Sequence, residues 1–214
     1  MDFKEFKKIP RLTRECVVTE KIDGTNGVIA IGEDPPSVWG AGVEFLVGSK
    51  TQWITPENDN HGFAKWALEN KEELLKLGKG LHYGEWWGQG INRNYGLKEK
   101  RFSLFNTARW SDDAVRPKCC LVVPILYTGL FDTLLFDGIL ATMKEQGSRA
   151  VPGWMKPEGI VIYHKAGNLL FKKTLEKDEG KDNALLEGRT QRQQAKTPEK
   201  RALQEGEGDG LQEI

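Results

Sequence analysis

The sequence predicts an α+β domain built on antiparallel sheets. Short runs of β-branched and aromatic residues recur along the chain, bounded by Gly, Pro, Asn and Asp, and such runs are typical of strands. Two longer segments with helical periodicity lie between these runs. Many strands with a few interspersed helices favour an α+β arrangement over regularly alternating parallel units.

The first expected strands flank a turn. Residues 15–31, ECVVTEKIDGTNGVIAI, predict strand, sharp turn and strand, because the central letters DGTNG are turn formers. A second, hairpin-like pair is expected around residues 37–39 and 43–48. Further strands are expected at 81–87 and 101–105.

The first helix is expected over residues 61–77. Asp59 or Asn60 could cap its start, an apolar face runs along it, and Gly78 ends it. Residues 131–145 predict the second helix.

The remaining strands lie in the second half of the chain. Residues 120–129, CLVVPILYTG, are almost continuously apolar, which predicts one buried strand. Residues 159–163 and 169–175 predict two more strands joined by a Gly-Asn turn. We therefore expect a folded domain over 1–181, and a polar, disordered tail over 182–214, where charge, Gln and Gly dominate.

Charge and composition restrict the possible functions. The chain has 31 Lys and Arg against 31 Asp and Glu, so its formal net charge is zero and any site for a polyanion must be a local patch. The expected patch is the cationic cluster Arg93, Lys98, Lys100 and Arg101. No apolar stretch approaches the roughly 20 residues of a membrane span, and the N-terminus lacks the apolar core of a signal peptide. With three Cys in no metal-binding spacing, we expect a cytoplasmic protein with reduced thiols. We also expect it to be a monomer.

The strongest chemical candidate is Lys21, in the segment Lys21-Ile22-Asp23-Gly24. A lysine at the end of a strand and next to a glycine turn has an exposed amine and room for a phosphate. An ordinary surface lysine before a turn gives the same pattern, so the motif alone leaves both interpretations open.

Two further segments suggest nucleotide contacts. Glu85, in GEWWG, could accept hydrogen bonds from a ribose, and a surface turn with packed tryptophans is the alternative. In the segment RFSLFN, strand alternation places Phe102 in the core and Phe105 on the opposite face, where it could stack on a base. The alternative is that both rings belong to the core.

Glu158 and Lys172 are charged residues at or within apolar strands. A carboxylate entering a buried strand needs a cation, and Mg²⁺ carried by ATP is a natural candidate. Otherwise Glu158 is simply exposed at the start of its strand. Lys172, in LFKKT, needs an anion, which a phosphate or Glu158 could provide.

The order of these segments along residues 20–174 resembles the covalent nucleotidyltransferase superfamily. The segments KIDGTN, GEWWG, FSLFN, PEGIVIY and FKKT are most similar to those of ATP-dependent RNA ligases of the phage RNA ligase 2 type. The resemblance implies a nucleotidyltransferase, or adenylation, domain. In that fold two antiparallel sheets, flanked by helices, hold the nucleotide between them.

The resemblance also implies roles for single residues. Lys21 would accept AMP, Glu158 would be the metal-associated carboxylate, and Phe105 would stack on adenine. The remaining nucleotide-binding residues would be Glu20, Ile22, Asn26, Lys50, Glu85 and Lys172.

Three departures from the family pattern are visible. Lys50 stands where the family often has Arg, and the last motif reads Lys-Lys-Thr rather than Lys-x-Lys. The segment PEGIVI is followed by Tyr163-His164, whereas this motif of the family often ends in Lys. Lysine cannot reproduce the two-pronged hydrogen bonding of arginine, which weakens the expected contact at Lys50.

The implied activity is ATP-dependent joining of a 5′-phosphate to a 3′-hydroxyl on nucleic acid, with RNA favoured. The implied cofactors are ATP and Mg²⁺ or Mn²⁺. Two enzyme alternatives remain, a minimal DNA ligase and a capping-type guanylyltransferase. A third alternative is a catalytically silent module that binds nucleotide or nucleic acid.

Overall fold

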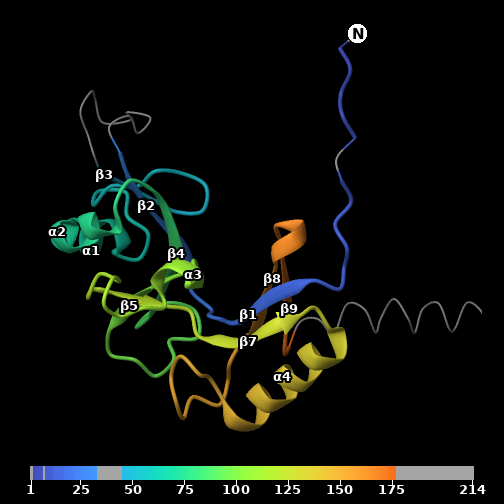
Figure 1. The fold of residues 1–214 in the computed structure, drawn as a ribbon. Helices are drawn as coiled ribbons and strands as arrows, with labels where there is room; N and C mark the ends of the chain where they lie inside the picture. The colour runs from blue at the N-terminus through green and yellow to red at the C-terminus, as the bar shows by residue number, and fades with distance from the viewer. Residues whose placement is uncertain (1, 7, 33–44, 177–214) are drawn as a thin grey trace, which may run out of the picture. The chain divides into compact units, whose positions relative to one another are not determined.

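The described part of the chain forms two β-sheets with helices packed on them (Figure 1). This computed structural model describes residues 2–6, 8–32 and 45–176. The expected strand at 37–39, the boundary at 181 and the tail over 182–214 lie outside the described residues. Among the helices within the described ranges, none has the length and apolarity needed to span a membrane.

Sheet A has four strands and is antiparallel throughout. Its order is β7-β1-β8-β9, and the strands are β1 (Glu15–Lys21), β7 (Ile125–Leu130), β8 (Gly159–His164) and β9 (Leu169–Thr174). Helix α4 (Thr133–Gln146) covers one face of this sheet through Phe136, Leu140 and Met143, which join the core cluster of Val18 and Ile160.

Sheet B has five strands in the order β3-β2-β4-β5-β6. They are β2 (Thr25–Ile31), β3 (Phe45–Gly48), β4 (Gly80–Gly88), β5 (Lys100–Leu104) and β6 (Cys120–Val122). The α+β class is confirmed, with one difference from two purely antiparallel sheets, because β5 and β6 are parallel. A parallel pair needs a long crossover, and here it contains α3 (Thr107–Trp110).

The prediction of a single buried strand over 120–129 is wrong. The segment is broken at Pro124 into β6 and β7, which belong to different sheets, and β7 is largely half-buried or exposed. Proline lacks the N–H needed to continue a ladder. Its carbonyl instead accepts a hydrogen bond from the Glu20 N–H at 2.9 Å, so the chain moves from sheet B to sheet A at this residue.

The helix expected over 61–77 is interrupted. It consists of α1 (Phe63–Glu69), α2 (Lys71–Leu74) and a short 3₁₀ turn, η1 (Leu75–Leu77). At the break, the Asn70 side-chain amide donates to the Trp66 carbonyl at 2.8 Å, a local bond that competes with helix continuation. The N-cap residue of α1 is Gly62 rather than Asp59 or Asn60. The Asp59 carboxylate nevertheless accepts from the Ala64 and Lys65 N–H groups in the first turn.

A small third core cluster lies where the chain passes between the sheets. The buried residues Ile22, Trp87, Tyr95 and Val123 form it, with Trp154 packed against them. β1 and β2 are joined by the sharp turn that was expected, but they enter different sheets. The Lys21 motif therefore sits at the junction of sheet A and sheet B.

Candidate active site

Lys21 and Glu158 form an ion pair at the junction. Lys21 is the last residue of β1, and its register partner on β8 is Gly159, so Glu158 arrives beside it. The Lys21 Nζ lies 2.7 Å from Glu158 Oε2, and the two side chains are 23% and 16% exposed. The cation that Glu158 needs is thus Lys21 in this structure. Among the described residues there is no group of three His, Cys, Asp or Glu side chains that could hold a metal by itself.

Gly24 permits a close approach of the turn after Lys21 to strand β4. A Cβ at this position would lie 2.4 Å from the Trp86 carbonyl oxygen on β4, so a larger residue would force the backbones apart. The Gly24 N–H donates to Glu85 Oε1 at 3.0 Å. The glycine of the motif therefore brings the carboxylate of sheet B next to the turn that follows Lys21.

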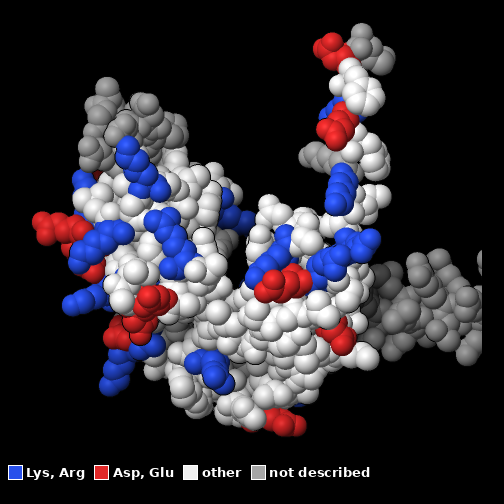
Figure 2. Space-filling view, viewed as in Figure 1, with Lys and Arg blue, Asp and Glu red and all other residues white. Residues whose placement is uncertain are grey.

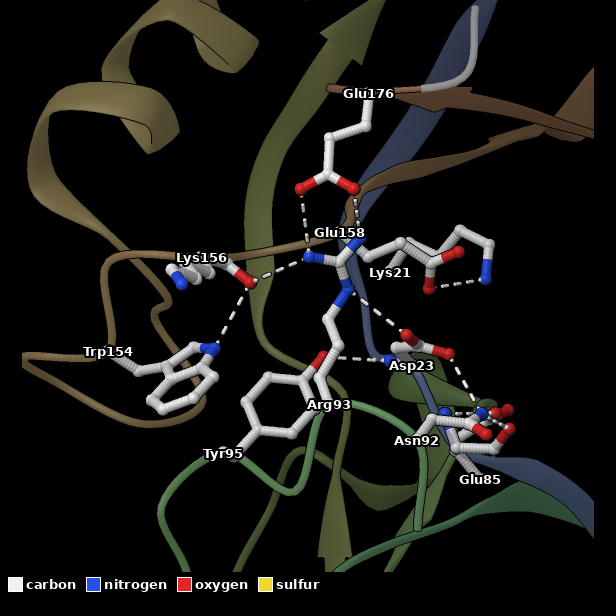
Figure 3. A network of polar contacts seen from close by, with 11 residues as sticks. Lys21, Asp23, Glu85, Asn92, Arg93, Tyr95, Trp154, Lys156, Glu158 and Glu176 are labelled. Carbon is white, nitrogen blue, oxygen red and sulfur yellow. Dashed lines mark hydrogen bonds and ion pairs between the residues drawn. The ribbon is translucent and has the colours of Figure 1, made fainter.

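The loop after β4 holds this turn from the other side (Figure 3). The Asp23 N–H donates to the Tyr95 hydroxyl at 2.7 Å, and the Asp23 carboxylate accepts from Asn92 Nδ2 at 2.9 Å and from Arg93 Nε at 3.0 Å. Tyr95 is fully buried with φ at 52°, an uncommon conformation for a bulky residue. Asn92 and Tyr95 were not among the residues predicted from the sequence, although the density of Asn and Gly directly after GEWWG indicates a specialised loop.

Glu85 and Asn26 face each other on neighbouring strands. They are register partners on β4 and β2, and Asn26 Nδ2 donates to Glu85 Oε2 at 3.2 Å. Burial raises the pKa of the Glu85 carboxyl to about 7, although the Lys21 charge and the Gly24 N–H act to lower it. Glu85 therefore changes its charge near neutral pH, within the range useful for binding and proton transfer.

A cleft of about 1060 Å³ is lined by residues of both sheets. Phe105 is 40% exposed in it and Phe102 is fully buried, which confirms the expected faces of this strand. The candidate residues that line the cleft are Glu20, Lys21, Ile22, Asn26, Glu85, Phe105 and Lys172. The structure thus brings most of the expected nucleotide-binding set to one place.

Lys172 does not lie inside an apolar strand, as was expected. Among the described residues β9 is the edge strand of sheet A, and most of its side chains are exposed. Lys172 is the register partner of Val161, its side chain lines the cleft, and Glu158 is paired with Lys21 instead.

Glu20, Ile22 and Lys50 are placed differently from the other candidates. The buried Glu20 carboxylate accepts from the Ser148 hydroxyl at 2.5 Å and from the N–H groups of Arg149 and Ala150, so it anchors that turn. Burial also raises its pKa. Ile22 packs in the third core cluster, and Lys50 lies exposed on the bend after β3, outside the cleft lining.

The expected cationic cluster is largely engaged in other contacts. Arg93 pairs with Asp23 and Glu176, and Arg101 pairs with Glu99 at 2.6 Å and lies over the Trp87 ring. Lys100 donates to the His61 carbonyl, whereas Lys98 is exposed. In the view of Figure 2, Lys and Arg side chains gather on the part of the molecule that holds sheet B and its helices.

Several solved structures of Naegleria gruberi RNA ligase are similar to this chain. A mutant with ATP and Mn is 21% identical, with a TM-score of 0.55 over 80% of this chain and 53% of that one. A mutant with AMP and Mn is 23% identical, with a TM-score of 0.54 over 83% and 52%. The ligase with PPi is also 23% identical, with a TM-score of 0.54 over 84% and 52%.

These likenesses show the fold, and the chain spans about half the length of the ligase chains it matches. No curated protein matches the sequence significantly. The family model described as RNA ligase matches residues 14–177, which include both sheets and every candidate residue of the cleft. The chain therefore belongs to the RNA ligase family.

Proposed function

We propose that the protein is an ATP-dependent RNA ligase in which Lys21 becomes covalently bound to AMP. The observation that carries the proposal is the position of Lys21 in a nucleotide-sized cleft, 2.7 Å from Glu158 and beside the Gly24 turn. The similar Naegleria structures contain ATP, AMP or PPi, the donor, the transferred group and the leaving group of such a reaction.

In the first step the Lys21 Nζ attacks the α-phosphorus of ATP. The ammonium of the ion pair first gives up a proton along its hydrogen bond to Glu158 Oε2, which frees the nitrogen lone pair. The nitrogen–phosphorus bond then forms, the bond to pyrophosphate breaks, and the second proton lost from the nitrogen passes to solvent. Catalysis of phosphoryl transfer rests mainly on positioning and charge neutralisation. Glu158 would position Lys21 through the ion pair between them.

The remaining cleft residues would hold the nucleotide. Phe105 offers an exposed ring to the adenine, and Asn26 and Glu85 offer polar atoms to the ribose. Lys172 offers a cation to the phosphates from the edge of sheet A.

A divalent metal fits this site only as a partner of ATP. Glu158 is a single carboxylate, so Mg²⁺ or Mn²⁺ would be held by Glu158 together with phosphate oxygens and water, a common mode for Mg²⁺. When bound, the ion would neutralise charge on the phosphates.

AMP would then pass to an RNA 5′-phosphate, and an RNA 3′-hydroxyl would displace AMP to seal the strand. The exposed Lys98, with Lys100 and Arg101 beside it, is the proposed contact for the RNA backbone. The gathering of Lys and Arg side chains over sheet B in Figure 2 supports RNA binding on this side of the molecule.

The test is to mix the protein with labelled ATP and Mg²⁺ and to look for label on the protein in a denaturing gel. We expect label on the wild type and on Lys144→Ala, which changes an exposed lysine of α4. Lys21→Ala should carry none, and Lys21→Arg should fail as well, because a guanidinium stays protonated. Undiminished label on Lys21→Ala would refute the proposal, and label from GTP instead of ATP would indicate a guanylyltransferase.

A further inference from the structure

We propose that Arg93 is a positioning residue that aligns Lys21 and Glu158 for AMP transfer, an inference that rests on the proposed function. Arg93 lies in the loop after β4 and does not line the cleft. Its guanidinium acts on the reacting groups through the three segments that it joins.

Four hydrogen bonds connect Arg93 to these segments (Figure 3). Its Nε donates to Asp23 Oδ2 at 3.0 Å, and its Nη1 donates to the Lys156 carbonyl at 3.3 Å. The Nη1 and Nη2 atoms donate to the two carboxylate oxygens of Glu176 at 3.3 and 3.1 Å. The side chain is only 18% exposed, so these contacts hold it in one orientation.

Each anchor lies a short distance along the chain from a group expected to take part in the reaction. Asp23 follows Lys21 by two residues, and Lys156 precedes Glu158 by two. Glu176 follows β9, the strand that carries Lys172. One guanidinium therefore sets the relative positions of the nucleophile turn, the carboxylate loop and the phosphate-binding strand.

The chemistry of these contacts requires arginine. A planar guanidinium can bond one carboxylate with two parallel N–H groups while a third N–H points elsewhere, which a single ammonium cannot reproduce. Partly exposed ion pairs contribute little to stability, and the Glu176 side chain is 63% exposed. Replacing Arg93 should therefore change the alignment of the site much more than the stability of the fold.

The chain offers a matched control in Arg116. That side chain is 14% exposed, pairs with Asp113, and donates to the carbonyls of Trp110 and Cys120. It thus has the same combination of a carboxylate and main-chain partners, but it joins none of the segments that carry Lys21, Glu158 or Lys172.

The experiment measures single-turnover formation of the protein–AMP adduct at increasing ATP concentration for Arg93→Lys and Arg116→Lys. We expect Arg93→Lys to lower the rate constant at saturating ATP by about tenfold or more, since small misplacements of reacting groups are costly. The ATP concentration at half-saturation should change by less than about threefold, and Arg116→Lys should stay within about twofold of wild type in both parameters. The melting temperatures of the two variants should be similar.

Further arms keep the outcomes distinct. Glu176→Gln removes the charge of this anchor and leaves one acceptor oxygen in place of two, so it should reduce the same rate constant by a smaller factor. Methylguanidinium added to Arg93→Ala should restore part of the rate constant that the truncation loses. Three outcomes would overturn the positioning role. Arg93→Lys could be as fast as wild type, it could change only the ATP concentration at half-saturation, or Arg116→Lys could lose as much of the rate constant as Arg93→Lys. A wild-type protein that forms no adduct would instead refute the proposed function, and the inference would fall with it.

Discussion

The Lys21 Nζ lies 2.7 Å from Glu158 Oε2, although 137 residues separate them in the chain. The contact exists because β1 and β8 are neighbours in sheet A, with Lys21 in register with Gly159. Gly159 is needed there, since a Cβ would lie 2.2 Å from the Lys173 carbonyl oxygen of β9. The strand order of sheet A therefore creates the ion pair at the centre of the proposed reaction.

Glu158→Ala is expected to slow adduct formation by at least tenfold, or about 1.4 kcal/mol of barrier, because Lys21 loses its partner. The measurement is single-turnover labelling with ATP across a Mg²⁺ titration. Glu99→Ala, which removes the partner of Arg101, is the control and should change little. Rates equal to wild type at every Mg²⁺ concentration would reduce Glu158 to a structural residue.

Phe102→Ala should chiefly change the stability of the fold, and Phe105→Ala should chiefly change the dependence on ATP. Phe102 is fully buried against Phe63 and Trp66, so its truncation should lower the free energy of unfolding by about 3–5 kcal/mol. Phe105 is 40% exposed in the cleft, so its truncation should chiefly raise the ATP concentration needed for half-maximal labelling. Denaturant unfolding and ATP titration of both variants distinguish the two roles. A stability loss in Phe105→Ala without a change in ATP dependence would contradict the stacking assignment.

Glu85 should make stability fall as the pH rises towards 7. Burial raises its pKa in the folded protein to about 7, so between its ordinary value of 4.5 and 7 the folded state binds a proton that the unfolded state does not. Folding is therefore favoured by this group at low pH, and the advantage is lost as the pH rises through about 7. A glutamine at this position avoids the buried charge.

The stability of Glu85→Gln relative to wild type should thus increase between pH 5 and pH 8. The limit is about 3 kcal/mol, since each pKa unit corresponds to about 1.4 kcal/mol. Urea unfolding of both proteins at several pH values measures it. Glu145→Gln, at an exposed position of α4, should show no such trend. A difference that does not vary with pH would show that Glu85 titrates at its ordinary value.

Lys98→Glu should weaken AMP transfer to a 5′-phosphorylated RNA while sparing adduct formation. Lys98 is exposed in the loop between β4 and β5, and it is a proposed phosphate contact. The defect should be about tenfold at low salt and should shrink as KCl is raised, because fewer phosphate contacts give a flatter salt dependence. Lys144→Glu is the matched charge reversal on α4. Equal transfer by both variants across the salt series would place the RNA elsewhere.

Local patterns in the sequence were enough to predict much of this molecule. The alternation around Phe102 and Phe105 separates a core ring from a cleft ring, because neighbouring side chains of a strand point to opposite faces. The glycine after Asp23 marks a sharp turn, and the structure shows that only a residue without a side chain fits beside Trp86. These features depend on a few adjacent residues, so they are visible without the fold.

Other features were decided by the tertiary structure. An apolar run suggested one strand where Pro124 divides two, because the pattern does not say which sheet each half will join. Arg93 belongs to a cationic run in the sequence, yet its hydrogen-bond partners come from three distant segments. Asp23, Lys156 and Glu176 lie 70, 63 and 83 residues away from it in the chain. The partners of a charged side chain depend on which strands and loops pack together, and that choice reflects the whole set of long-range contacts rather than the residues on either side.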